Sequence, residues 1–228
     1  MAFAVRAGTN SLATPDNLAR WGRPVNTKCN MDGCNATCTL GHLLSACPKS
    51  LDRFTFRHDS VLQHLLNTIV RRKKEGMLVY ADLSGWRVNG GTVPHEMALT
   101  EQKPDLVIID KSVKPVKILL VELTVPWDSS QNFQAALDRK TARYERLTED
   151  LKQAGYDARN LPLEIGCRGV VNQRNAANLE YICNLVGIRG ILKLKGALGR
   201  IALIGSYRIW LARYSQEWSA GELIIVKE

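Results

Sequence analysis

The sequence lacks any hydrophobic run long enough to cross a membrane. A spanning helix needs roughly 20 consecutive apolar residues, and the closest stretch here is the short segment Ile201 to Ile204. The N-terminus, Met1 to Arg6, also lacks the basic start and long apolar core of a signal peptide. We therefore expect an intracellular protein without a membrane partner, whose cysteines serve a purpose other than disulfides.

Acidic residues are scarce relative to basic ones. The 228 residues contain 31 Lys+Arg and 22 Asp+Glu, which gives a formal charge of +9 and favours a polyanionic partner. Residues 101–160 are balanced, with 10 basic and 10 acidic side chains, whereas both flanks are basic. This arrangement would suit carboxylates held against a nucleic acid, although an uneven solvated surface would look the same. The sequence also lacks internal repeats and low-complexity segments, which favours one compact domain with a small appendage.

Four of the six cysteines fall within 19 residues, together with a histidine. The spacing Cys29-x4-Cys34-x7-His42-x4-Cys47 offers four ligands that can surround one structural Zn²⁺ tetrahedrally. Cys38 is an alternative second ligand, but it lies only four residues before His42, so we favour Cys34. A segment this poor in core residues would take its stability from the metal.

Hydrophobic periodicity predicts alternating helices and strands. Helices are expected over 60–70, capped by Asp59 or Ser60, and over 129–154, 174–186 and 190–213. Strands are expected over 77–81, 106–110, 117–125, 161–171 and 222–227, with the second and third forming a hairpin. The resulting divisions are an N-terminal arm (1–26), a zinc knuckle (27–50), an α/β core (51–190) and a basic helical extension (191–228).

Two basic segments allow two interpretations each. The run Arg71 to Lys74 is either a phosphate contact or nuclear address, or a helix end that matches the helix dipole. In the last helix, Arg189, Lys193 and Arg200 gather on one side, as a phosphate-facing ridge or an ordinary solvated face.

The clearest chemistry lies between residues 103 and 144. Asp105 begins one predicted strand and Glu122 lies amid apolar residues in the next, where an unpaired carboxylate is costly to bury. In a hairpin the two carboxylates can converge and hold Mg²⁺. Lys140 occupies the sheet-facing stripe of the following helix, whose other members are Phe133, Leu137, Tyr144, Leu147 and Leu151. It would therefore meet the two acids, as a catalytic group or as part of a purely structural network.

These residues resemble a known nuclease family. Lys103-Pro-Asp105, Glu122 to Asp128 and Arg139-Lys140 followed by Tyr144 are similar to the PD-(D/E)xK core of restriction-like endonucleases in early-branching non-LTR retrotransposons. The likeness extends to the CCHC knuckle, Arg53 to Asp59, Tyr80 to Leu83 and Glu164 to Gly169, in order and over almost the whole chain.

The resemblance implies a restriction-endonuclease-like fold, a mixed central sheet flanked by helices and preceded by the knuckle. It implies a DNA endonuclease that leaves a 3′-hydroxyl, with Asp105 and Glu122 binding Mg²⁺ or Mn²⁺ and Lys140 as the third catalytic group. Arg57 and His58 would contact DNA or support the site, and Tyr144 is either core or site. His58 is equally well explained as a helix-capping histidine. The implied partners are DNA, the element's RNA and a reverse transcriptase supplied by another chain or absent from this segment, in the nucleus.

Two other functions fit the same sequence. The first is a nucleic-acid-binding module that no longer cleaves, in which the basic flanks supply salt-dependent binding. The second is a zinc-stabilised protein-interaction domain with no nucleic-acid role. Nicking activity and DNA binding at low salt distinguish the three.

Overall fold

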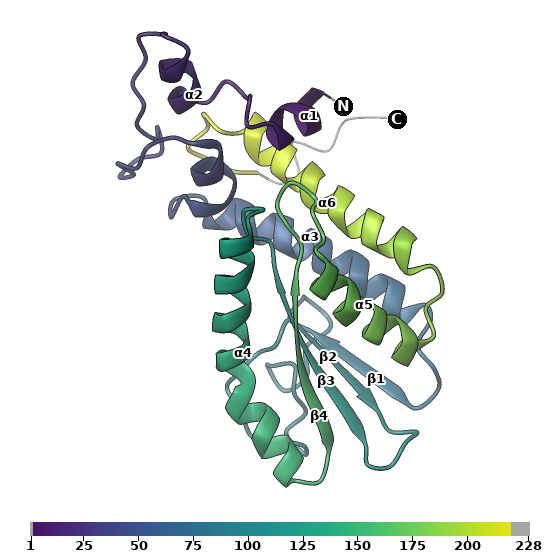
Figure 1. The fold of residues 1–228 in the computed structure, drawn as a ribbon. Helices are drawn as coiled ribbons and strands as arrows, with labels where there is room; N and C mark the ends of the chain where they lie inside the picture. The colour runs from purple at the N-terminus through teal and green to yellow at the C-terminus, as the bar shows by residue number, and fades with distance from the viewer. Residues whose placement is uncertain (1, 220–228) are drawn as a thin grey trace.

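The computed structural model describes residues 2–219 as a mixed α/β fold (Figure 1). The helices are α1 (Ala2–Gly8), α2 (Pro15–Arg20), the π-helical turn η1 (His42–Ala46), α3 (Leu51–Val70), α4 (Ser130–Gln153), α5 (Gln173–Val186) and α6 (Ile191–Leu211). The strands are β1 (Met77–Ala81), β2 (Leu106–Asp110), β3 (Lys117–Thr124) and β4 (Asp157–Glu164). In the described part of the chain, no helix combines the length and hydropathy that a membrane span requires.

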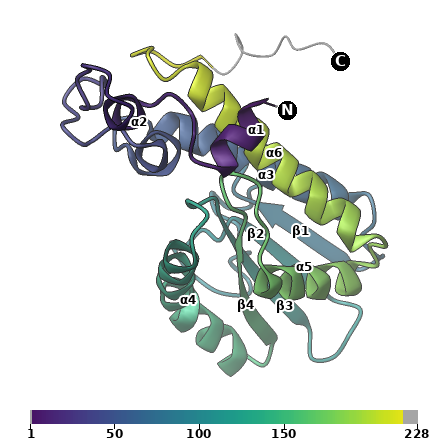
Figure 2. The same cartoon turned by 45° about the horizontal axis from the view of Figure 1, so that its top comes forward.

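The four strands form one sheet in the order β1-β2-β3-β4. Strands β1, β2 and β3 are antiparallel neighbours, whereas β4 returns through α4 and pairs parallel to β3. The predicted hairpin of β2 and β3 is therefore confirmed. Helices α3, α5 and α6 cover one face of the sheet and α4 covers the other (Figures 1 and 2). Both faces of the central strands are thus buried, which explains their nearly continuous apolar sequence.

The predicted start of the first long helix is wrong. Helix α3 begins at Leu51 after Ser50, so Asp59 and Ser60 lie inside it and do not cap it. Buried positions of α3 recur every four residues at Val61, Leu65 and Ile69, and the same spacing extends toward the N-terminus to Arg57 and Arg53. Because these two buried positions hold arginines instead of apolar residues, the hydrophobic pattern hid the first turns of the helix.

The bounds predicted for the last core strand are also wrong. Strand β4 covers Asp157–Glu164 and not 161–171. It is an edge strand in which polar side chains alternate with buried ones, so its first half lacks an apolar run. Beyond Glu164 the chain turns through Gly169, whose φ of 90° ends the extended conformation. The other predicted strands and helices agree with the structure within three residues at each end, apart from 222–227, which lies outside the described residues. The sequence analysis did not predict α1, α2 or η1.

Helix α6 packs along α3 at very short range. A Cβ atom on Gly205 would lie 2.6 Å from Cγ of Arg57, and one on Gly199 would lie 2.5 Å from the carbonyl oxygen of Gly169. Two of the three glycines of α6, Gly199 and Gly205, are therefore positions where the helix closely approaches its neighbours. This packing builds α6 into the same apolar core as α3 and the sheet.

Candidate nuclease-like and metal sites

The β2–β3 hairpin brings Asp105 and Glu122 together. The register pairs Leu106 with Val121, so Asp105 and Glu122 occupy the next row, on one face of the sheet. The backbone N–H of Asp105 donates to Oε2 of Glu122 at 3.2 Å, and the N–H of Leu123 donates to Oδ2 of Asp105 at 2.8 Å. The two carboxylates are thus fixed by backbone donors at the level where β2 begins.

Helix α4 supplies the cation expected beside them. Nζ of Lys140 donates to Oε1 of Glu122, and Nη1 of Arg143 lies 3.7 Å from the same oxygen. The Glu122 side chain is 2% exposed and that of Lys140 is 16% exposed. Burial and the neighbouring Asp105 charge raise the pKa of Glu122, while Lys140 opposes the rise. Glu122 is therefore a buried carboxylate that is costly to ionise, and the ammonium group of Lys140 is its hydrogen-bonded partner.

His58 approaches the pair from α3. Its Nε2 lies 3.2 Å from Oδ2 of Asp105, and its Nδ1 lies 2.9 Å from Oδ1 of Asp59. Burial lowers the pKa of His58, but hydrogen bonds and charges from both carboxylates outweigh it and raise the pKa to about 10. His58 is in mid-helix, so the capping alternative is wrong. It holds Asp105 in place as a cationic neighbour.

Arg57 and Tyr144 are buried supports. Arg57 is 1% exposed and donates to the carbonyls of Leu44 and Val125 and to the hydroxyl of Ser206. It therefore joins η1, the end of β3 and α6, and its burial fits the supporting role, of the two roles expected for it. Tyr144 is fully buried, and its hydroxyl donates to the carbonyl oxygen of Lys103 at 3.1 Å, which fixes the segment that leads into Asp105.

The cysteine cluster has the geometry of a tetrahedral metal site. Ligand atoms of Cys29, Cys34, His42 and Cys47 all lie within 4.8 Å of one another. The sulfur atoms of Cys29 and Cys47 are 3.9 Å apart, and Sγ of Cys34 lies 3.5 Å from Nε2 of His42. Zn–S bonds of about 2.3 Å in a tetrahedron require similar spacings. The four residues therefore fit a zinc ion.

Cys34, and not Cys38, belongs to this group. The turn at Gly33, with φ of 72°, directs Cys34 toward the cluster. Burial lowers the pKa of His42, which keeps its imidazole neutral, and a backbone hydrogen bond from Ala36 lowers the pKa of the Cys34 thiol. Neutral imidazole and thiolate are the forms that bind zinc.

Sequence reasoning missed two acidic residues near these sites. Asp82 follows β1 in the row of Asp105 and Glu122, and its N–H donates to the carbonyl oxygen of Asp105 at 2.9 Å. Its position directly after a predicted strand was the available signal.

Asp128 is the second of these residues. Its side chain is 2% exposed and accepts from the backbone N–H groups of Arg168 and Val170. No local pattern identifies that contact, because its partners lie 40 residues away.

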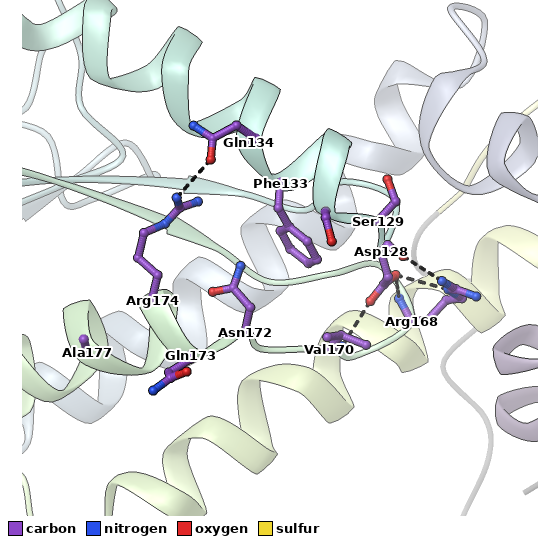
Figure 3. A pocket seen from close by; sticks show the side chains of 11 residues that line it. Asp128, Ser129, Phe133, Gln134, Arg168, Val170, Asn172, Gln173, Arg174 and Ala177 are labelled. Atoms are coloured by element: carbon purple, nitrogen blue, oxygen red, sulfur yellow. Dashed lines mark hydrogen bonds and ion pairs between the residues drawn. The ribbon is translucent and has the colours of Figure 1, made fainter.

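Asp128 also borders a pocket beside the sheet. The pocket has a volume of about 840 Å³ and lies between the first turns of α4 and α5 (Figure 3). Arg168 is held by Asp128 at 3.3 Å, and Arg174 lies 3.3 Å from Oε1 of Gln134 and 3.6 Å from Glu164. Both arginines thus have protein partners, and none of the predicted catalytic residues lines this pocket.

Neither protein-family models nor curated proteins supply a relative of this chain. No protein-family model matches the chain. A search of curated proteins also finds no match. Function is therefore argued from the two sites.

Proposed function

We propose that the chain is a metal-dependent DNA endonuclease with a PD-(D/E)xK core and a structural zinc knuckle, resembling the nicking domain of early-branching non-LTR retrotransposon proteins. The observation that carries the proposal is the cross-strand pair Asp105 and Glu122 with Lys140 from the following helix. The strand topology supports it, because an antiparallel meander followed by a helix and a parallel strand places all three residues on one face.

Asp105 and Glu122 are the residues that would hold Mg²⁺ or Mn²⁺. Two carboxylates at one level of a sheet suit a hard cation, and burial together with the Asp105 charge, which raise the pKa of Glu122, are costs that such a cation would offset. When bound, the metal would neutralise charge on the scissile phosphate and lower the pKa of a coordinated water. Asp105 is oriented for this by the Leu123 N–H and His58.

Lys140 would position the attacking water and offset negative charge on the phosphate. Its side chain is 16% exposed beside a buried carboxylate, so a bound phosphate could reach it. A fixed cation placed in advance stabilises developing charge without reorganisation. The product would carry a 3′-hydroxyl that a polymerase can extend.

A plasmid-nicking assay in Mg²⁺ or Mn²⁺ tests the proposal. We expect Lys140→Met to lower the nicking rate by about 100-fold or more. Lys152→Met, an exposed lysine on the same helix, is the matched control and keeps the wild-type rate. Because Lys140→Met removes the closest cation from the buried Glu122, the melting temperature of the variant is measured to confirm that it is folded. Wild-type rates in a folded Lys140→Met protein would refute the assignment.

A non-cleaving nucleic-acid-binding module is the second candidate. The observation that favours it is that the charges pair among themselves, His58 with Asp105 and Lys140 with Glu122. Such a network is able to persist as structure alone. Salt-dependent DNA binding by the wild type with no nicking in either metal would select this function.

A further inference from the structure

Helices α3 and α6 run antiparallel, which brings two basic segments together. Near the start of α3, Nη1 of Arg53 donates to the carbonyl oxygen of Ala212 and Nη1 of Arg57 donates to Ser206, both near the end of α6. The C-terminal end of α3 therefore lies beside the start of α6, as Figures 1 and 2 show. Lys74 packs close to Gly187, just before α6.

The side chains gathered there are exposed cations. The α3/α6 basic ridge consists of Arg71, Arg72, Lys74, Arg189, Lys193 and Arg200. Two of them, Arg71 and Arg200, lie near His64 of α3, because burial and the charges of these two arginines lower the pKa of His64. Two segments more than 100 residues apart thus contribute to one positive field.

The ridge has no internal charge balance. Within residues 2–219, none of its six members forms an ion pair, and Glu75, the one acid in the adjoining α3–β1 loop, forms none either. Exposed arginines of α4 differ, since Arg146 pairs with Asp150 and Arg143 lies near Glu122. Clustered like charges repel one another, and a polyanion relieves that cost.

We propose that the α3/α6 basic ridge binds the sugar-phosphate backbone of duplex DNA. The inference rests on the proposed function, because the candidate nuclease site supplies the reason for the chain to hold a duplex.

Fluorescence anisotropy with a duplex of about three helical turns tests the ridge. The full chain is used with zinc retained and without Mg²⁺ or Mn²⁺, between about 50 and 200 mM salt. The triple variant Arg71→Gln/Lys74→Gln/Lys193→Gln removes three ridge charges from exposed positions. We expect it to bind roughly tenfold or more weakly at low salt, with a slope of log K against log salt reduced by about 2.7, or 0.9 per phosphate contact.

The matched control removes three exposed charges that lie outside the ridge, two on α4 and one on the edge strand β4. Arg146→Gln/Lys152→Gln/Arg159→Gln alters α4 and β4 and should keep the wild-type slope. Equal weakening by both triples would overturn the ridge. A loss confined to single-stranded RNA of the same length would also overturn it, in favour of an RNA partner. Because binding is measured without cleavage, failure of the nicking assay leaves this result intact. A ridge variant that binds duplex DNA as tightly as the wild type would reject the ridge alone.

Discussion

At the residue scale, three buried carboxylates on the sheet differ in how their charges are paired. Glu122, Asp110 and Glu164 are all buried carboxylates on the sheet. Asp110 accepts from the backbone and side chain of Ser112, and Glu122 has Lys140. Glu164 has neither arrangement, because both of its oxygens lack a hydrogen-bond donor and Arg174 lies 3.6 Å away. Burial raises the pKa of Glu164.

The cost of this carboxylate should appear in the pH dependence of stability. Because the folded-state pKa of Glu164 is raised, the folded protein binds this proton more tightly than the unfolded chain does. The stabilisation is fully present below pH 4.5, the ordinary pKa, and is lost as pH rises through the folded-state value. Glu164→Gln lacks this loss, and its melting temperature should exceed that of the wild type by a margin that widens from pH 5 to pH 8. The measurement is differential scanning calorimetry in zinc-containing buffers. A constant or negative margin would show that Glu164 is adequately paired.

At the element scale, close approach of backbones decides how α6 sits. Gly199 touches Gly169, and Gly205 touches the stem of Arg57, whereas Gly196 of the same helix has no atom within 4 Å of its Cβ position. Helix propensity alone favours alanine at all three positions. Only the tertiary packing distinguishes Gly196, where a side chain has room, from Gly199 and Gly205, where it does not.

This contrast gives a pair of opposite expectations. Gly196→Ala should stabilise the protein by about 0.5–1 kcal/mol, since it adds helix propensity in open space. Gly199→Ala should destabilise it by roughly 1–3 kcal/mol, because the added methyl meets the backbone of Gly169. Urea unfolding at neutral pH measures both. Equal effects of the two substitutions would mean that the approach of α6 is not constrained at Gly199.

At the scale of the whole molecule, the segment of the candidate zinc ligands shares the main core, and one guanidinium adds polar links between them. Arg57 donates to the carbonyl oxygen of Leu44 in η1, to that of Val125 after β3 and to Ser206 in α6. His42, a candidate zinc ligand, lies in the same turn as Leu44. The stability of the knuckle and that of the core should therefore be linked.

Removal of a zinc ligand tests this linkage. Cys34→Ser should lose the bound zinc and lower the melting temperature of the whole protein, since a ligand at 1,000 times its Kd contributes about 4 kcal/mol. Cys38→Ser, equally buried but outside the ligand group, should retain one zinc per chain. Elemental analysis and calorimetry measure the two effects. Zinc loss in Cys38→Ser but not in Cys34→Ser would show that the ligand set is wrong.

Local patterns were sufficient for much of the architecture. Strands β1 and β2 were predicted to the residue and β3 within one, because each is an apolar run between turn residues. The ligand group with Cys34 in place of Cys38 also follows from spacing along a short segment. In these cases the residues that interact are close in sequence or belong to a single repeating pattern.

The sequence by itself thus determined the alternation of helices and strands, the hairpin and the position of Lys140 on a sheet-facing stripe. Only the tertiary structure decided that α3 begins at Leu51, that Arg57 is a buried support, that Asp82 joins the row of Asp105, and that the cations of α3 and α6 form one surface. The physical reason is range. Periodicity reports which side of an element is buried, whereas partners for buried arginines and neighbours for exposed ones come from chain segments far away in sequence.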